Sequence, residues 1–245
     1  MSRIPLRAIA AVCMSMGAAH AVAQSPETII VTAARSAQPL SASLADTTVI
    51  GEDEIQRSTG QSLPQLLQRQ PGLEVTVNGG PGGTSGVFIR GANSAQALVL
   101  VDGLRVGSSS TGATSLEAIP LDQIERIEIV RGPASSLYGA DAMGGVIQVF
   151  TKSGSPGFAA QASAGYGTDA TRNLSAGLRG GTGMLRYSLQ AGATKSEGFN
   201  AIVNPANFSY NPDRDGYEAS NVGGSLAFDW AAGQTLELHG LHNRL

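Results

Sequence analysis

The sequence has almost no cysteine. Its single thiol, Cys13, lies close to the N-terminus, so the chain cannot form an internal disulfide bond. Charged residues are scarce as well, at 14% of the chain, and no cluster of Lys or Arg marks a nucleic-acid-binding face. The chain also lacks any apolar run of about 18 residues, so it could cross a membrane only as β-strands.

The first 23 residues are typical of a secretion signal. Arg3 and Arg7 precede a short apolar run at 9–19, and residues 21–23 read Ala-Val-Ala, a cleavage motif that predicts a mature start at Gln24. A lipid anchor at Cys13 is the alternative. Val12 is bulky for the residue before such an anchor, and Cys13 lies inside the apolar run, so a cleaved signal peptide is favoured.

Residues 24–46 are predicted to be a polar tail with one β-forming segment at 27–33. Successive β-formers in a polar tail predict an extended strand that has no partner in its own neighbourhood. Such a strand is either an edge strand of the next domain or one reserved for the sheet edge of another protein.

Residues 47–152 are predicted to form a compact domain of helices and strands. Ser62 is suited to cap a helix whose leucines share one face, and Pro71-Gly72 ends it. Asp102-Gly103 is a two-residue hairpin signal. Two loops of small residues span 78–86 and 107–115. Strands are predicted at 48–50, 73–77, 87–89, 97–101, 104–106, 124–130 (with one wet face) and 144–151, and a helical turn at 53–58.

From residue 159 the pattern changes to five segments in which apolar and polar residues alternate. Segments of about ten residues with one apolar and one polar face are typical of transmembrane β-barrels. Tyr166 and Trp230 lie near strand ends, where aromatic residues mark the membrane interface. A soluble antiparallel sheet with one wet face is the alternative. Five strands cannot close a barrel of even strand number, and the chain ends at Leu245 directly after a strand, so a truncated barrel is expected.

The residues do not support an enzyme. The glycine-rich loop at 78–86 lacks the Lys of a phosphate-binding loop. Past the signal, histidine occurs only at His239 and His242, and neither a Ser/His/Asp set nor zinc-ligand spacing can be assembled. Asp102 fits a turn residue better than an acid catalyst.

Four stretches together resemble the TonB-dependent outer-membrane receptor family: 27–33, 98–103, 127–133 and 137–147. The resemblance implies an α+β plug domain followed by the first strands of an antiparallel transmembrane β-barrel in the outer membrane of a Gram-negative bacterium. It also implies active transport, in which ligand binding outside releases a TonB box to the periplasmic protein TonB. That segment comprises Glu27, Thr28, Ile29, Ile30, Val31, Thr32 and Ala33. Outer-membrane lipid would surround the barrel.

Within the family, the chain is most similar to cobalamin receptors, through residues 78–80, 88–93 and 198–216. The resemblance implies cobalamin contacts on two apical plug loops, at Thr84, Ser85, Gly86, Asn93, Thr111 and Gly112. A siderophore or another metal chelate is the alternative substrate. A passive outer-membrane pore is the alternative of another class, although an open pore needs neither a docking strand nor a plug.

The resemblance also implies a calcium site on an extracellular barrel loop. The matching positions are Asn200, Asn211, Asp213 and Asp215, whose oxygen ligands suit calcium. Asn200 stands where the family prefers Asp, and a solvated turn at Asp215-Gly216 is the alternative. No other cofactor is expected.

Charged residues near the predicted plug strands leave two alternatives open. Arg90, Arg131, Glu125 and Glu128 either form a charged layer between plug and barrel or face solvent. In the family such charges hold the plug in place. Core positions are predicted at Ile127, Ile129, Val146 and Val149.

Overall fold

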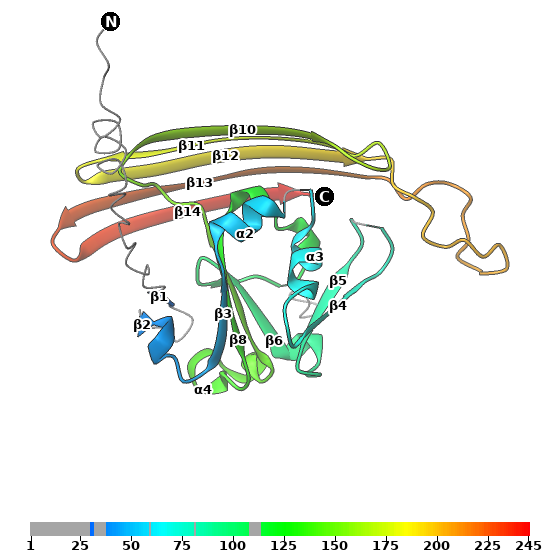
Figure 1. Cartoon of the computed structure of the whole chain (residues 1–245), viewed down its shortest axis with the longest axis horizontal. Coiled ribbons are helices and arrows are strands. Elements are labelled where there is room, and N and C mark those ends of the chain that lie inside the picture. Colours follow the sequence, from blue (N-terminus) through cyan, green and yellow to red (C-terminus); the bar gives the residue numbers. More distant parts are fainter. Residues whose placement is uncertain (1–29, 32–37, 59, 81, 108–113) are drawn as a thin grey trace, which may run out of the picture.

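The computed structural model describes residues 30–31, 38–58, 60–80, 82–107 and 114–245 (Figure 1). The predicted signal peptide lies outside them. Two units are stacked on each other. Residues 38–152, here called the plug region, form a mixed α/β unit, and five long strands of residues 157–244, here called the outer sheet, lie across it.

The plug region is built on a five-stranded sheet in the order β3-β8-β9-β6-β7. The strands are β3 (Asp46–Ile50), β6 (Ala97–Val101), β7 (Leu104–Arg105), β8 (Ile124–Arg131) and β9 (Gly145–Thr151). Only the β6·β9 pair is parallel. The predicted core residues Ile127, Ile129, Val146 and Val149 are fully buried, which confirms them.

Both faces of β8 are covered, so the predicted wet face is wrong. Helix α2 (Glu52–Arg57) lies against this strand on the side of the main core. On the other side Val130 packs in a second apolar cluster with Leu98, Leu100 and Val146, beside α4 (Ser135–Tyr138). Glu128 is fully buried, on a strand that lies between β3 and β9. The alternation of Ile and Glu suggested solvent on one side, whereas this strand is covered by segments distant in sequence.

The predicted second helix is confirmed as α3 (Leu63–Gln68). The Gln65 side chain accepts a hydrogen bond from the Ser62 backbone N–H at 2.9 Å, which is half of a capping box. Leu63, Leu66 and Leu67 share the buried face because helix positions three and four apart lie together. Short 3₁₀ turns, η1 (Leu40–Ala42), η2 (Ser94–Gln96), η3 (Leu116–Ala118), η4 (Leu121–Gln123) and η5 (Ala140–Ala142), complete the connections.

Two hairpins shape the ends of the plug region. Asp102 and Gly103 both have positive φ, at 48° and 79°, as the predicted two-residue turn between β6 and β7 requires. β4 (Leu73–Val77) and β5 (Ser85–Ile89) form a separate hairpin. Its tip is the first glycine-rich loop. This loop is shorter than predicted, because Ser85 and Gly86 belong to β5, where they pair with Val77 and Thr76 of β4.

The outer sheet is an antiparallel meander of five neighbouring strands, as predicted from the alternation. They are β10 (Gly157–Tyr166), β11 (Arg172–Thr182), β12 (Leu185–Ser196), β13 (Tyr217–Ala231) and β14 (Gln234–Arg244). The sheet is open, and a long loop at 197–216 projects from one end of it (Figure 1). Among the described residues, no helix has the length and apolar character needed to cross a membrane.

The tail differs from its prediction in one respect. Ile30 and Val31 form a two-residue strand, β1, that pairs with Pro39 and Gln38 of β2. The predicted absence of a local partner is therefore wrong. The paired residues Val31 and Gln38 are only seven positions apart in the sequence. The rest of the 27–33 segment lies outside the described residues.

Candidate functional site

The tip of the β4–β5 hairpin lies against the base of the long loop at 197–216. Residues 78–80 and 82–84 belong to this tip, here called the apical loop. A Cβ atom added at Gly82 would stand 2.8 Å from Cβ of Tyr217, and one at Gly80 would stand 3.6 Å from the carbonyl oxygen of Asp215. Glycine at position 82 therefore permits a close approach that a side chain would block. The two loops meet in one surface.

A carboxylate fixes the base of the apical loop. Glu117 Oε2 accepts hydrogen bonds from the Ser85 backbone N–H at 3.2 Å and from its hydroxyl at 2.5 Å. Glu117 belongs to η3, which follows the second small-residue loop directly. The bonds therefore join the ends of the two loops that were predicted to bind substrate.

The other predicted substrate residues differ in their exposure and in their hydrogen bonds. Thr84 is exposed, and its carbonyl accepts the Asn78 N–H at 2.9 Å, which closes the apical loop. Gly86 lies within β5, where an added Cβ would stand 3.7 Å from Cβ of Ser94. Asn93 is exposed, and its Oδ1 accepts the Ala95 N–H at 3.1 Å, so it caps η2. Thr111 and Gly112 lie outside the described residues.

Three of the four predicted metal ligands meet at the base of the long loop. Asn200 Nδ2 donates to the Asn211 carbonyl at 2.6 Å, and Asp215 Oδ2 accepts the Ala201 N–H at 2.8 Å. The Asn200 Oδ1 atom accepts the Ile202 N–H at 2.9 Å. Hydrogen bonds that order the loop thus occupy some of these oxygens. In the described ranges, no group of three or more His, Cys, Asp or Glu side chains is arranged to hold a metal.

Polar contacts join the plug region to the outer sheet along its length. Gln123 Nε2 donates to Asn221 Oδ1 on β13 at 2.5 Å, and the Ser188 hydroxyl on β12 donates to the Lys152 carbonyl at 2.7 Å. His239 Nδ1 on β14 lies 3.4 Å from Asp102 Oδ2 at the β6–β7 turn. These side chains all lie on the sheet face that covers the plug region.

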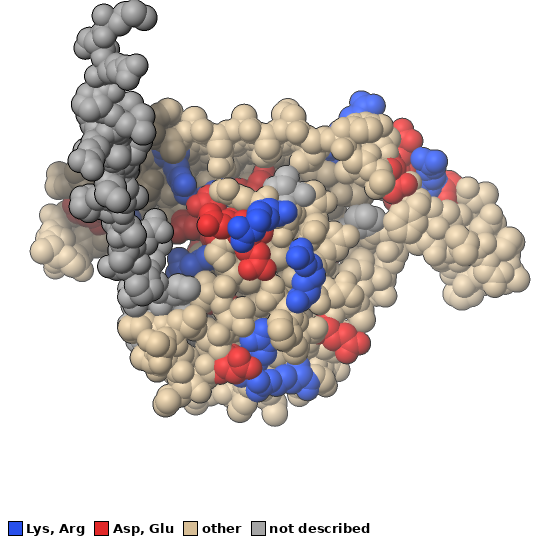
Figure 2. Space-filling view, viewed as in Figure 1, with Lys and Arg blue, Asp and Glu red and all other residues tan. Residues whose placement is uncertain are grey.

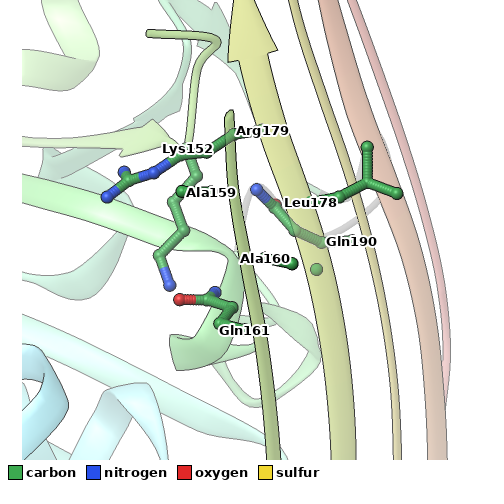
Figure 3. Close-up of a pocket in the computed structure, with 8 residues that line it drawn as sticks. Lys152, Ala159, Ala160, Gln161, Leu178, Arg179 and Gln190 are labelled. Atoms are coloured by element: carbon green, nitrogen blue, oxygen red, sulfur yellow. The ribbon is translucent and has the colours of Figure 1, made fainter. Parts of the chain in front are cut away.

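A small cavity lies where the end of the plug region meets β10, β11 and β12. It measures about 70 Å³, which is enough for a few water molecules. Figure 3 shows Lys152 and Gln161 pointing toward each other in this cavity, whereas Leu178 points to the opposite side of the sheet. Lys152 Nζ lies 3.8 Å from Glu52, and Arg179 lies 3.6 Å from the same carboxylate. Burial lowers the pKa of the Lys152 ammonium, and the Glu52 carboxylate opposes this shift.

Comparison with known proteins assigns this architecture. Residues 39–146 match the TonB-dependent Receptor Plug Domain. The plug region therefore belongs to the plug-domain family of TonB-dependent receptors. It is 40% identical over 201 residues to a vitamin B12 transporter, BtuB, of Vibrio vulnificus, an alignment that covers 81% of this chain and 32% of the transporter. The chain spans about a third of the length of the curated relatives it matches.

Solved structures of this receptor family share the arrangement of plug and strands. The siderophore receptor PirA of Acinetobacter baumannii superposes with a TM-score of 0.66 at 25% identity, over 80% of this chain and 31% of that one. A ferric enterobactin receptor, PfeA, of Pseudomonas aeruginosa superposes with a TM-score of 0.66 at 26% identity, over 82% of this chain and 33% of that one. The five-strand outer sheet therefore corresponds to part of a receptor barrel.

The four charged residues singled out in the sequence, Arg90, Arg131, Glu125 and Glu128, neither form one charged layer between plug and outer sheet nor all face solvent. Arg131 is buried inside the plug, where it donates to the Pro71 carbonyl at 2.7 Å and to the Thr48 hydroxyl at 2.8 Å. Arg90 is half exposed and pairs with Asp46. Glu125 accepts hydrogen bonds from Ser153 at 3.2 Å. Glu128 is buried and accepts from Arg126 Nε at 2.9 Å. Sequence reasoning missed the charges at the sheet, Glu52 and Arg179, because no local motif marks that long-range pair.

Proposed function

We propose that this chain is part of a TonB-dependent transporter that carries cobalamin across the outer membrane. One observation carries the proposal: the apical plug loop and the long loop of the outer sheet meet through Gly82 and Tyr217 at the same end of the molecule. A ligand resting there would contact both units at once. The relatives at about 40% identity are named as vitamin B12 transporters, which favours cobalamin as that ligand.

The proposed substrate contacts are Thr84, Ser85, Gly86 and Asn93, together with Thr111 and Gly112 of the second loop. Thr84 is exposed on the apical loop, and Asn93 is exposed beside η2; both carry polar groups that suit the amide-rich periphery of a corrinoid. Ser85 is buried and bonded to Glu117, so its part is to hold the loop.

Calcium is proposed as a loop-ordering ion held by Asn200, Asn211, Asp213 and Asp215. Asn200 is bonded to the Asn211 carbonyl, Asp215 accepts the N–H of the adjacent Ala201, and Asp213 supplies a second carboxylate. Calcium takes six to eight oxygen ligands, so backbone carbonyls and water would complete its shell.

Residues 27–33 are proposed as the TonB box. An extended segment can add to the sheet edge of a partner through main-chain hydrogen bonds. The local pair of Ile30–Val31 with Gln38–Pro39 is only two residues long, so its release costs little. A ligand that favours the released state couples the two ends of the plug reciprocally.

The experiment that tests this function is cobalamin binding to the native gene product purified in detergent, titrated with and without calcium. Saturable binding that calcium strengthens supports both the substrate and the metal loop. Binding that ignores calcium retains the substrate and rejects the metal site. The same protein, tested with ferric siderophores, addresses the alternative that the solved siderophore receptors favour. Saturable siderophore binding without cobalamin binding would show that cobalamin is not the substrate.

A passive pore is the alternative of another class. It predicts solute flux without TonB and without saturation. Uptake of labelled cobalamin in cells with and without TonB separates the two, because active transport stops when TonB is absent.

A further inference from the structure

The two faces of the outer sheet are chemically different. Side chains alternate between the faces along each strand. One face covers the plug, as the bonds of Ser188 and Asn221 show. The other, here called the outward face, carries exposed apolar side chains. They include Phe158, Leu174, Leu178, Leu189, Leu226, Phe228, Leu236 and Leu238.

Charge on the outward face is confined to one end. In the five strands, all of which the structure describes, the outward face carries Arg172, Lys195, Glu218 and Arg244. All four lie at the end from which the 197–216 loop projects. At the opposite end the outward side chains include Phe158, Leu185, Phe228 and Trp230, which are all apolar or aromatic. In Figure 2 the sheet is tan along most of its visible length, and blue and red atoms gather near that loop.

Strand register places these charges in a continuous row. Tyr166 pairs with Arg172, Arg172 with Lys195, and Lys195 with Glu218, so the row crosses four strands. Lys195 and Glu218 are about seven-tenths exposed and lie 3.3 Å apart. Arg244 pairs with Ser220 in the next row. The row therefore holds two cations and one anion, and Arg244 adds a third cation beside it, so this patch keeps an excess positive charge.

A groove of about 230 Å³ lies beside this row. Its outward lining residues are Arg172, Leu174, Ala193, Lys195, Glu218 and Ser220. Ala193 and Ser220 are small, and they pair with each other next to the taller Leu174, which leaves the sheet hollow at this point. The groove is basic at its rim and apolar where it continues into the outward face.

We propose that this groove binds the phosphorylated headgroup of a lipid in the outer leaflet. Arg172 and Lys195 would pair with a phosphate group, which accepts charge-assisted hydrogen bonds from both. Its acyl chains would lie over Leu174 and the apolar residues beyond it. Soluble phosphate has no acyl chain to contact the apolar residues, and a neutral lipid has no phosphate to pair with Arg172 and Lys195. The inference rests on the outer-membrane location in the proposed function, but not on the transported substrate.

The experiment measures diphosphoryl lipid A bound to the native gene product in neutral detergent, by native mass spectrometry and by titration with a fluorescent lipid A. The Arg172→Gln/Lys195→Gln variant is compared with Arg214→Gln. Arg214 is an exposed cation in the neighbouring loop, outside the row. We expect the double variant to lower lipid affinity by about tenfold and the control to stay within about twofold.

Glu218→Gln supplies a test in the opposite direction. Removal of the one carboxylate in the row should raise lipid affinity by roughly twofold to fivefold, since a phosphate would no longer be repelled there. Retained cobalamin binding shows that each variant is folded. If a variant binds neither ligand, single Arg172→Gln and Lys195→Gln variants replace it.

Three results would overturn the site. The double variant could bind lipid A as tightly as the natural protein does, or the natural protein could bind dephosphorylated lipid as tightly as diphosphoryl lipid A. The third is displacement of bound lipid A by inorganic phosphate at equal concentration. Loss of lipid binding with intact cobalamin binding would support the lipid site separately from transport. Conversely, if the natural protein binds lipid A but not cobalamin, cobalamin is rejected as the substrate and the lipid site is retained.

Discussion

The Glu117 carboxylate accepts both hydrogen-bond donors of Ser85, its backbone N–H and its hydroxyl, across 32 positions of sequence. Ser85 begins β5, directly after the apical loop, and Glu117 follows the second loop. One side chain thus fixes the spacing between two loops that are otherwise rich in glycine and small residues. Preorganised loops bind with less loss of conformational entropy.

The first prediction concerns this bond. Glu117→Ala should weaken cobalamin binding and destabilise the plug by roughly 1–3 kcal/mol, because it leaves two donors of the buried Ser85 without their acceptor. Titration calorimetry and thermal unfolding measure both effects. Glu74→Ala is the matched control, since Glu74 is exposed on the neighbouring strand. Unchanged affinity in Glu117→Ala would show that the spacing of the loops does not matter for binding.

A second prediction concerns Gly82. An added methyl group would stand 2.8 Å from Cβ of Tyr217, so Gly82→Ala must displace either the apical loop or the base of the long loop. We expect cobalamin affinity to fall by about tenfold, which corresponds to roughly 1.4 kcal/mol. Gly51→Ala is the control, because an added Cβ there meets nothing within 4 Å. Equal affinities of the two variants would refute a functional contact between the loops.

Local pattern was enough to predict most of the elements. The leucine spacing after Ser62 predicted α3, Asp102-Gly103 predicted the turn, and the alternation after residue 159 predicted the outer strands. Each of these features depends on residues close in sequence. The plug assignment came from the family resemblance and is borne out by the match over 39–146. The barrel assignment came from the alternation as well as the resemblance, and the solved receptors that superpose on this chain support it.

The parts that sequence could not predict depend on distant contacts. Glu128 reads as a solvent-facing residue of an alternating strand, yet segments before and after β8 bury it. The Glu117–Ser85 and Gly82–Tyr217 contacts join residues 32 and 135 positions apart, and no motif marks either pair. Register across the outer sheet, which aligns Arg172, Lys195 and Glu218, also emerges only from the paired strands.

A third prediction tests how the plug is held against the outer sheet. Gln123 is only 2% exposed, and its Nε2 donates to Asn221 at 2.5 Å. Asn221→Leu removes that acceptor and should lower the stability of the docked plug by roughly 1–3 kcal/mol. Urea titration with a fluorescent label on the plug would detect this change. Val222→Leu, on the outward face of the same strand, should leave the midpoint unchanged. A shift of equal size in both variants would argue against a specific role for Asn221.

The fourth prediction addresses the proposed TonB box. Ile30→Pro removes a backbone N–H donor and hinders strand addition to a partner sheet. Cobalamin binding should persist, while TonB-dependent uptake should fall by at least about tenfold, a loss of roughly 1.4 kcal/mol or more in coupling. Ile30→Val keeps the donor and the β-branched side chain, and serves as the control. Normal uptake by the proline variant would place the docking strand elsewhere.

The final prediction concerns pH. Burial raises the pKa of the Asp122 carboxyl above its ordinary value of 3.8, against the opposing effects of its own backbone hydrogen bond and the Lys152 ammonium. Below 3.8 the carboxyl is protonated in both the folded and the unfolded chain. Between 3.8 and the raised folded pKa the folded chain keeps a proton that the unfolded chain has lost, so stability falls as pH rises through that window. Above the window the folded protein carries a buried carboxylate.

Asp122→Asn cannot ionise, so it should be more stable than the natural protein at neutral pH, and the difference should vanish in acid. Thermal unfolding at a series of pH values from 3 to 8, chosen to bracket roughly the ordinary carboxyl pKa and neutrality, measures this. Asp53→Asn, at an exposed position of α2, is the control and should show no such trend. A variant that loses stability at neutral pH would mean that the attraction between Asp122 and Lys152 outweighs the cost of burying the carboxylate.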